Sequence, residues 1–372
     1  MTRLPRPSFA LSRTARRRGL LKGALAGGAL AVIRARPSGR AEADTLPLTP
    51  ASGAPRPAYA CTLGAQQAPQ LCEYWIQADA FQHNLVPNGR DGLMGMDYND
   101  GQTSYMAVGY RAFTPNWEQP LQGSDDLGAN SGIPGPVLRA AVGDTLRVHF
   151  RNNDTHYGFP HSMHPHGLLY TPENDGAWTA RDPQKPGTAV AAGESYTYEW
   201  TAAASSVGTW LYHDHSVPKS LIADPPMAEL GAELGLFGII AVTDDTTPAV
   251  DREFCLFMHD LYQADIPELG QDFDCFNGRA FLENTPTLQV VEGERVRFRI
   301  ASLGNEFHAF HLHGHRWQYN GRYDDTLVLG PATTVTFDFV EDSPGEWLYH
   351  CHVTEHMMGG MAGLYRAQPA GG

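Results

Sequence analysis

GEWLYHCHVTEHMMGGM, residues 345–361, places one cysteine between two histidines, a third histidine four residues later and a methionine five residues after that. These are soft or borderline metal ligands. In the strand that this segment predicts, neighbouring side chains point to opposite faces. Cys351 therefore lies on one face and His350 and His352 on the other, so the thiolate and the two imidazoles serve different metals.

Cys351 has three further candidate ligands beside it, His308, His356 and Met361. A thiolate, two imidazoles and a weak axial thioether are the ligand set of a blue copper centre. The spacing from Cys351 to His356 to Met361 predicts a tight loop at one end of a β-sandwich.

The chain contains an internal duplication. GTWLYHDH (208–215) matches GEWLYHCH (345–352) at six of eight positions, and HSMHPHG (161–167) matches HAFHLHG (308–314) at its three histidines and its glycine. Upstream of each pair, TLRVHFRN and RVRFRI alternate apolar and polar residues, which predicts a strand with one buried face. The two halves therefore share one architecture.

Short alternating strands, frequent Gly and Pro and no long helical period predict an all-β chain of two β-sandwich domains. A length of 372 residues suits two domains. The polar segment DDTTPAV (244–250) predicts the linker. We expect an N-terminal extension over 44–70, a first domain over 71–243 and a second over 250–368.

The first 43 residues predict an export signal. RRGLLKG (17–23) is a twin-arginine pair followed by an apolar stretch that is too short to span a membrane, and AEA (41–43) is a candidate cleavage site. The alternative is a basic tail. We expect a Tat-type signal and a periplasmic or secreted protein. The formal net charge of −14 argues against nucleic acid or an anionic membrane as a partner.

Four of the five cysteines stand outside any metal-like cluster. In an oxidising compartment they can form two disulfides. Pairing of neighbours in sequence, Cys61 with Cys72 and Cys255 with Cys275, is our first choice among three connectivities. The alternative is that they are buried thiols.

Eight histidines form four H-x-H pairs. On a strand, residues i and i+2 share a face, so each pair can converge on one metal cluster. Eight imidazoles suit three copper ions better than one zinc, which takes three or four protein ligands. The pairs are His164/His166, His213/His215, His311/His313 and His350/His352.

Together the motifs H-x-H-G, W-x-x-H-x-H and H-C-H-x-x-x-H-x-x-x-x-M resemble those of multicopper oxidases, and the two-domain organisation is similar to that of the bacterial small laccases. The resemblance covers roughly residues 132–365 and implies two cupredoxin-like Greek-key domains with four copper ions per chain. It implies type 1 copper at His308, Cys351, His356 and Met361, type 2 copper at His164 and His311, and a type 3 pair at His166, His213, His215, His313, His350 and His352.

The resemblance also implies a reaction and an assembly. Cys351 would carry electrons from the type 1 site, and Tyr170 and Asp175 match a tyrosine and an acidic residue beside the cluster of small laccases. Dioxygen would be the electron acceptor. The chain would form a homotrimer with its trinuclear clusters between subunits.

The first half departs from the repeat. Asp214 stands where Cys351 stands in the second half, and Lys219 and Asp224 stand at the positions of His356 and Met361. His161, the counterpart of His308, loses its metal-binding partners. We therefore expect blue copper in the second domain alone, unlike the copper nitrite reductases, which carry it in the first domain and need fewer histidines.

Two functions remain open. The first is a laccase-like oxidase of phenols and aromatic amines. The second is a copper-tolerance (cuprous oxidase) or electron-transfer protein, which a long Met- or His-rich insert would favour; the sequence contains no such insert. Copper nitrite reductase is a weaker rival. The histidines His83, His149, His156, His259 and His315 are expected to bind no metal, with His149 on a solvated face.

Overall fold

The computed structural model describes residues 69–121, 130–224 and 228–371. They belong to one compact unit, Glu42–Gly372. The predicted export signal over 1–43, and most of the predicted extension over 44–70, lie outside the described residues. Within the described ranges, no helix is long and apolar enough to cross a membrane.

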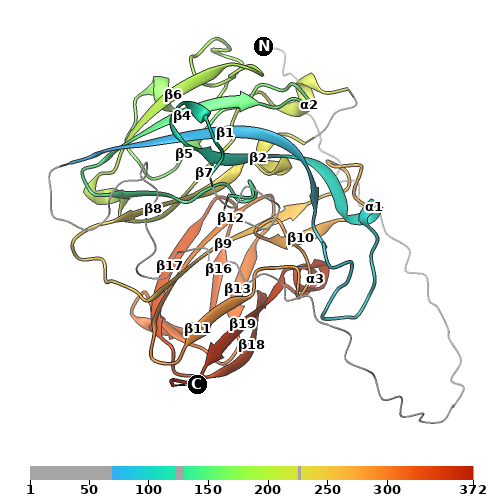
Figure 1. The fold of residues 1–372 in the computed structure, drawn as a ribbon, viewed down its shortest axis with the longest axis vertical. Helices are drawn as coiled ribbons and strands as arrows, with labels where there is room; N and C mark the ends of the chain where they lie inside the picture. The colour runs from blue at the N-terminus through green and yellow to red at the C-terminus, as the bar shows by residue number, and fades with distance from the viewer. Residues whose placement is uncertain (1–68, 122–129, 225–227, 372) are drawn as a thin grey trace, which may run out of the picture. The chain divides into compact units, whose positions relative to one another are not determined.

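The first sandwich runs from Leu71 to Thr243 and consists of two four-stranded sheets (Figure 1). Their strand orders are β2-β1-β4-β6 and β3-β8-β7-β5. The strands are β1 (Leu71–Asn84), β2 (Ser104–Phe113), β3 (Leu138–Ala141), β4 (Thr145–Asn153), β5 (His164–Pro165), β6 (Ser195–Thr201), β7 (Gly208–His213) and β8 (Phe237–Thr243).

The second sandwich runs from Arg252 to Gln368. Its sheets have the orders β10-β9-β12-β17 and β11-β19-β18-β13-β16, and β14 and β15 form a separate hairpin. The strands are β9 (Arg252–Leu261), β10 (Phe273–Phe276), β11 (Leu288–Val291), β12 (Arg295–Leu303), β13 (His308–Leu312), β14 (Trp317–Tyr319), β15 (Arg322–Asp324), β16 (Thr326–Leu329), β17 (Thr334–Val340), β18 (Gly345–Cys351) and β19 (Ala362–Gln368).

The duplication extends to strand pairing. The parallel pairs β1·β4 and β3·β8 of the first sandwich recur as β9·β12 and β11·β19 in the second. The predicted all-β class is confirmed, because the helices are short. They are α1 (Asp100–Thr103), α2 (Lys219–Ile222), α3 (Thr354–Gly359) and the 3₁₀ turns η1 (Pro115–Trp117), η2 (Pro172–Asn174), η3 (Ala204–Ser206) and η4 (Gly231–Leu234).

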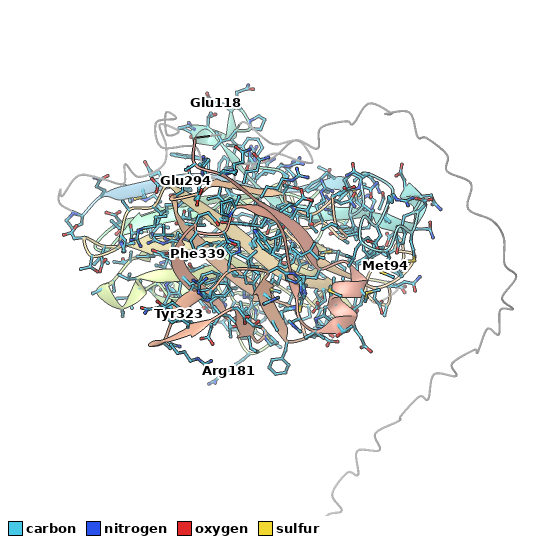
Figure 2. All side chains as sticks on the ribbon, turned by 90° about the horizontal axis from the view of Figure 1, so that it is seen from below. Met94, Glu118, Arg181, Glu294, Tyr323 and Phe339 are labelled. Atoms are coloured by element: carbon cyan, nitrogen blue, oxygen red, sulfur yellow. The ribbon has the colours of Figure 1, made fainter. Side chains whose placement is uncertain are left out.

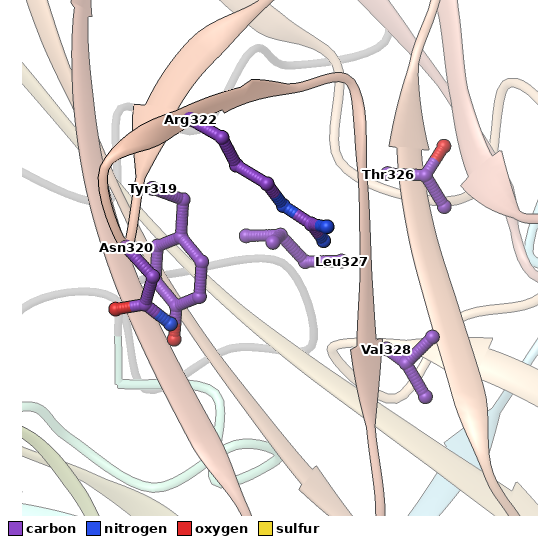
Figure 3. A pocket seen from close by; sticks show the side chains of 6 residues that line it. All are labelled: Tyr319, Asn320, Arg322, Thr326, Leu327 and Val328. Atoms are coloured by element: carbon purple, nitrogen blue, oxygen red, sulfur yellow. The ribbon is translucent and has the colours of Figure 1, made fainter.

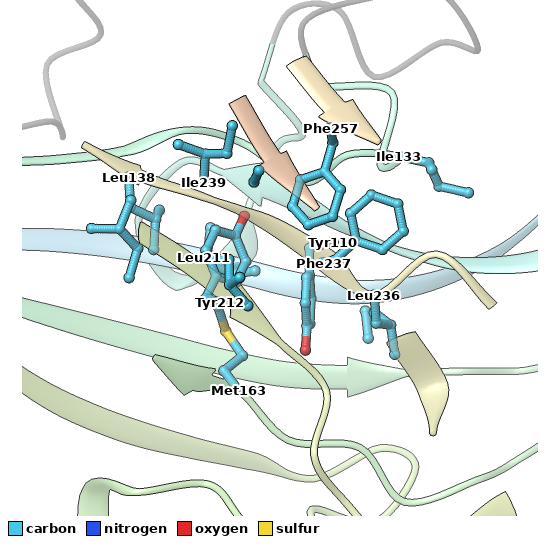
Figure 4. Packing of buried hydrophobic residues seen from close by; sticks show 14 of the residues in the cluster. Tyr110, Ile133, Leu138, Met163, Leu211, Tyr212, Leu236, Phe237, Ile239 and Phe257 are labelled. Atoms are coloured by element: carbon cyan, nitrogen blue, oxygen red, sulfur yellow. The ribbon is translucent and has the colours of Figure 1, made fainter. Parts of the chain in front are cut away.

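The predicted apolar faces of β4 and β12 are buried, and side chains fill the space between the sheets (Figure 2). In the first core, Phe237 packs on Phe257 of β9, with ring centroids 4.2 Å apart (Figure 4). In the second core, Trp317 stacks on Phe337 at 4.0 Å. Burial of each large apolar side chain contributes about 1.5–3 kcal/mol to the free energy of unfolding.

An ion-pair network joins the two sandwiches. Glu253 of β9 lies 2.5 Å from Arg139 of β3 and 2.6 Å from Arg299 of β12. Arg299 also donates to the Gly208 carbonyl and the Thr209 hydroxyl, at 3.2 and 3.1 Å. Burial opposes ionisation of Glu253, but the two guanidinium charges lower its pKa to about 2. Arg299 of β12 therefore meets the first sandwich rather than water.

The predicted disulfide between Cys255 and Cys275 is wrong, because both are free, buried thiols. Cys275 of β10 pairs with His259, four residues beyond Cys255 on β9. Four strand residues span roughly 13 Å, well beyond the Cα separation of about 7 Å that a disulfide tolerates. Cys72 is disulfide-bonded, and Cys61, the partner that the sequence predicts for it, lies outside the described residues.

Candidate metal centres

Three predicted ligands of the type 1 site meet at one end of the second sandwich. His308 begins β13, Cys351 ends β18 and His356 lies in α3. The Cys351 Sγ atom is 4.0 Å from His308 Nδ1 and 3.7 Å from His356 Nδ1. All three side chains are buried, and their ligand atoms lie close enough together to bind one ion.

Met361, the predicted axial ligand, is fully buried and belongs to the same loop. Its backbone N–H donates to the His356 carbonyl, and its carbonyl accepts the Cys351 N–H, both at 3.0 Å. The Ala309 N–H donates to the Cys351 sulfur at 3.3 Å. Burial raises the pKa of the Cys351 thiol, so a bound cation is what would hold it as a thiolate.

The outer nitrogens of the two histidines face carboxylates. His308 Nε2 lies 3.5 Å from Asp260 Oδ1, and His356 Nε2 lies 3.5 Å from Glu306 Oε2. Carboxylates in such positions orient metal-binding imidazoles. Asp260 stands directly opposite Asp274 in the β9–β10 pair, where two like charges are unfavourable. Burial, and next the charge of Asp260, raise the pKa of Asp274.

Four histidines gather at one end of the first sandwich. The ring centroids of neighbouring members lie 5.1–5.6 Å apart. His166 Nε2 is 3.2 Å from His213 Nε2, close enough for both to bind one ion through bonds of about 2.0–2.1 Å. We call these residues the first histidine set: His164, His166, His213 and His215.

The imidazoles of the first set are in the form that binds metal. Burial lowers the pKa of His164, that of His166 to about 4 and that of His213 to about 3, so they are neutral at pH 7. His164 Nδ1 donates to the Asp175 carbonyl at 2.6 Å and His213 Nδ1 to the Asp214 carbonyl at 2.9 Å. Their Nε2 atoms therefore carry free lone pairs.

A second histidine set repeats this arrangement in the second sandwich. Its ring centroids lie 5.1–5.5 Å apart. His313 Nε2 is 3.1 Å from His350 Nε2, and His350 Nδ1 donates to the Cys351 carbonyl at 2.8 Å. His311 Nδ1 lies 2.8 Å from the Asp325 carbonyl and 2.9 Å from the Thr326 hydroxyl. The second set consists of His311, His313, His350 and His352.

The two sets stay apart within one chain. Among the residues that the structure describes, no candidate metal group contains histidines of both sets, and no ring contact joins the sets. Each sandwich thus presents four of the eight predicted cluster ligands.

The glycine after each H-x-H pair has a structural reason. Gly167 and Gly314 have φ of +71° and +72°, a region that favours glycine. A Cβ on Gly167 would lie 1.9 Å from the Trp210 ring, and one on Gly314 would lie 2.9 Å from Trp347. The tryptophan of G-x-W-L-Y-H therefore packs on the glycine of H-x-H-G, which sets the distance between the two strands that carry each set.

Tyr170 and Asp175 both lie beside His164. The ring of Tyr170 is 6.2 Å from that of His164, and Asp175 Oδ1 is 3.3 Å from His164 Nδ1. Lys185 Nζ lies 2.5 Å from Asp175 Oδ2 and holds that carboxylate. The sequence did not predict Lys185 as a site residue, because it lies in a loop that has neither a repeated motif nor an alternating pattern.

Charged side chains fill the place in the first sandwich that corresponds to the type 1 site. Asp214 Oδ2 lies 3.1 Å from His161 Nδ1 and 3.3 Å from Lys219 Nζ, and all three side chains are fully buried. His161 is thus not left without partners, as the sequence suggests, because an aspartate and a lysine have replaced the metal ligands.

The five histidines that were expected to bind no metal belong to no candidate metal group among the described residues. As predicted, His149 lies on a partly solvated face of β4, with its side chain 20% exposed, and it stacks on Trp75 at 4.5 Å and lies 3.1 Å from Glu73. His315 lies 3.0 Å from the buried carboxylate of Glu341. The five are His83, His149, His156, His259 and His315.

A cavity of about 460 Å³ borders the second set (Figure 3). Thr326, whose hydroxyl contacts His311, and Val328 line it on one side, and Tyr319 and Arg322 of the β14–β15 hairpin line the other. Val328 is 69% exposed and neighbouring Tyr323 is 67% exposed. Tyr323 is labelled in Figure 2.

Two family models, both described as multicopper oxidase, match residues 116–246 and 258–371. The chain belongs to the multicopper oxidase family. Members of this family bind copper, which suits the donor chemistry of the buried His308–Cys351–His356 group.

This multicopper oxidase is 34% identical over 250 residues to a probable nitrite reductase–hydroxylamine oxidoreductase fusion protein of Kuenenia stuttgartiensis, which covers 63% of this chain and 28% of the relative. It is 26% identical over 362 residues to a human ferroxidase, with 79% of this chain and 28% of that protein covered. Mouse ceruloplasmin is 27% identical over 344 residues, with 78% and 32% covered. The chain thus spans about a third or less of these relatives.

Solved structures share the fold. A multicopper oxidase matches with a TM-score of 0.59 at 24% identity, over 80% of this chain and 89% of that one. A blue copper oxidase of Nitrosomonas europaea matches at 0.58 and 22%, over 80% and 86%. A copper nitrite reductase of the same organism matches at 0.55 and 20%, over 81% and 94%. These likenesses confirm the predicted cupredoxin-like fold.

Proposed function

We propose that this multicopper oxidase is laccase-like and couples one-electron oxidation of phenols and aromatic amines to reduction of dioxygen to water. One observation carries the proposal. Cys351 points into the buried site with His308 and His356, while its neighbours His350 and His352 belong to a four-histidine set. A single peptide segment therefore joins an electron-accepting site to a site for oxygen.

Copper, when bound, supplies the one-electron transfers and the four-electron reduction of dioxygen. We assign four ions to each chain. Type 1 copper is assigned to His308, Cys351, His356 and Met361, type 2 copper to His164 and His311, and the type 3 pair to His166, His213, His215, His313, His350 and His352.

In this proposal, residues beside His164 accept and donate protons during the reduction of dioxygen. Lys185 fixes the Asp175 carboxylate, whose Oδ1 lies 3.3 Å from His164 Nδ1 and can accept or release a proton there. Burial, and next the charge of Asp175, raise the pKa of Tyr170, so the phenol stays protonated at neutral pH.

A complete cluster requires a second chain. Each sandwich presents one histidine set, and the two sets are not in contact within one chain. A neighbouring copy that lays its first set on the second set of this chain supplies the missing four imidazoles. Such a head-to-tail contact closes into a ring, and we propose a homotrimer, as in small laccases.

Oxidation of a metal cation is the second candidate function, and it includes the cuprous oxidase role. Asp260, Asp274 and Glu306 lie beside His308 and His356, so an electron donor that approaches the type 1 site meets carboxylates. A cation such as Fe(II) or Cu(I) would relieve the repulsion between Asp260 and Asp274. Ferroxidases among the relatives are consistent with this role.

Oxygen consumption with several donors distinguishes the candidates. Phenols, aromatic amines, Fe(II) and Cu(I) are each offered as electron donors to the copper-loaded protein at several pH values, and nitrite is offered separately as the electron acceptor, with one of these donors and without oxygen. A laccase turns over the aromatic donors, and Glu306→Gln changes its rates with aromatic donors and with cations alike. A metal oxidase prefers the cations and loses rate in Glu306→Gln but not in the exposed control Glu346→Gln. Turnover of nitrite alone contradicts both.

We also propose export by the Tat route, on the evidence of the twin arginines in residues 17–18. This proposal rests on the basic residues of the N-terminal segment and not on the fold. Replacing both arginines by lysine should keep the protein in the cytoplasm, as cell fractionation would show, and unchanged export would contradict it.

A further inference from the structure

The charged cluster of the first sandwich repeats the plan of the type 1 site without a metal. His161, Asp214 and Lys219 occupy the positions that two histidines and the cysteine hold in the second sandwich. Asp214 Oδ2 lies 3.1 Å from His161 Nδ1 and 3.3 Å from Lys219 Nζ, and none of the three side chains is exposed. Together with Asp154 we call them the ionic centre.

Every donor and acceptor of Lys219 and Asp214 is used. Asp214 Oδ1 accepts the backbone N–H groups of Ser162 and Ser216, at 2.7 and 3.1 Å, and the Ser162 hydroxyl at 3.1 Å. Lys219 Nζ donates to two backbone carbonyls, at 2.9 and 3.2 Å, and to Asp214. An ammonium has three donors, so its buried charge is fully hydrogen-bonded.

The ionic centre balances its charges. His161 Nε2 lies 3.2 Å from Asp154 Oδ2, and His161 Nδ1 lies 3.1 Å from Asp214 Oδ2. Both ring nitrogens thus face carboxylate oxygens. The two carboxylates therefore have the His161 ring and the Lys219 ammonium as partners, and buried charges are tolerated when they are paired in this way.

The ionic centre is tied directly to the first histidine set. Asp214 lies between His213 and His215 in the chain. The Ser162 hydroxyl accepts the His215 N–H at 3.1 Å and donates to Asp214, and Ser162 stands two residues before His164. The Asp214 carboxylate thus connects the two segments that carry all four histidines.

We propose that the ionic centre takes the place of a metal in the first sandwich and positions the first histidine set for copper binding. The inference rests on the copper cluster of the proposed function. Lys219 supplies the positive charge that draws Asp214 against His161, as a bound copper ion would draw the ligands of the second sandwich together. His161, Asp214 and Lys219 are positioning residues, since they reach the copper only through the histidines.

Gly231 packs against the ionic centre, where a larger residue would not fit. A Cβ on Gly231 of η4 would lie 2.1 Å from Asp214 Oδ2 and 3.0 Å from His161 Nδ1. Gly231→Ala therefore pushes the carboxylate out of place without removing any charge, which separates the geometry of the centre from its electrostatics.

Charge-removing variants of the oligomer provide the test. Lys219→Met and Asp214→Asn each leave one buried charge without its partner, whereas the double variant removes one charge of each sign and keeps the Asn Oδ1 bonds to Ser162. Each single variant should retain copper about 10–100-fold more weakly against a chelator and change the type 2 paramagnetic resonance spectrum. The double variant should recover the wild-type copper affinity and the wild-type type 2 spectrum. Arg366→Met, which breaks an exposed ion pair with Glu346, is the control.

The outcomes separate clearly. Lower unfolding temperatures with an unchanged type 2 spectrum and copper affinity would mean a structural role only and would overturn the inference. A wild-type protein without type 2 or type 3 signals would contradict the proposed function instead. Where a single variant does not fold, Gly231→Ala and Ser162→Ala answer the question, since both should shift the type 2 spectrum and leave the blue absorption of Cys351 unchanged.

Discussion

Two inactive variants should restore each other's activity if the trinuclear cluster lies between chains. The first variant carries His164→Ala and His166→Ala and loses the first histidine set. The second carries His350→Ala and His352→Ala and loses the second set. Each set lies in a different sandwich of the chain, so each variant keeps one intact half of the site.

The expected recovery follows from counting interfaces. In a ring of three, each cluster pairs the first set of one chain with the second set of the next. With equal random mixing, about three quarters of the trimers contain both variants, and each of these has one intact cluster out of three. Activity per chain should therefore reach about one quarter of the wild-type value in the unselected mixture at equal mixing, and about one third in oligomers selected to contain both variants. In the unselected mixture it should fall towards zero as either variant predominates.

The assay uses co-expressed variants with different affinity tags, purified over both tags so that every oligomer contains both chains. Oxygen consumption with a phenolic donor and copper content per chain are measured on the same preparation. The matched control mixes the two variants after separate assembly, where no exchange occurs and no activity is expected.

A cluster formed within one chain predicts no activity at any mixing ratio, because every chain carries a lesion. Proven co-assembly without recovery would falsify the inter-subunit cluster. A fully active monomer in light scattering would contradict it independently, since one chain keeps its two histidine sets apart.

Four further predictions follow from single positions. Cys351→Ser should abolish the intense blue absorption and nearly all oxidase activity but leave much of the remaining copper bound; a variant that stays blue refutes the type 1 assignment. Asp214→Cys alone should create no second blue centre, by copper counting and paramagnetic resonance, since Lys219 takes the place of a histidine ligand. The pKa of Glu253 is lowered to about 2 by its neighbouring arginines. Its ionised carboxylate should therefore contribute about 3 kcal/mol to the free energy of unfolding above pH ~4.5, and this contribution should be lost as the pH falls towards 2. Urea unfolding of Glu253→Gln should therefore show a flatter acid dependence than the wild type. Gly314→Ala places a Cβ at a residue with φ of +72° and close to the Trp347 ring. It should lower the free energy of unfolding by about 1–3 kcal/mol, measured by urea unfolding.

The fold was accessible from sequence because its signals are local and repeated. The period of two along β4 and β12 marks the buried faces, and the paired motifs around residues 161–167 and 308–314 reveal the duplication. The histidine sets were accessible for the same reason, since residues i and i+2 on a strand share a face whatever the rest of the fold does.

The remaining features depend on register and on contacts between distant segments. Asp260 and Asp274 are neighbours only because β9 and β10 pair with those two residues opposite each other. The same register places Cys275 opposite His259 and away from Cys255, which is why proximity in sequence predicted a disulfide that the fold does not form. Lys185 reaches Asp175 from a loop with no period.

The divergence between the two sandwiches is itself informative, because the repeats have kept some positions and changed others. Both keep the glycine and the tryptophan that set the distance between the histidine-bearing strands, as Gly167 with Trp210 shows. The positions of Cys351 and His356 are instead held by Asp214 and Lys219, a buried pair whose bonds are all satisfied. In our proposal, each sandwich needs the same strand spacing for its histidines, and it needs a cation at its end, either a metal ion or an ammonium group. The sandwich proposed to accept electrons would then hold a metal ion there, whereas the sandwich that presents only histidines holds Lys219.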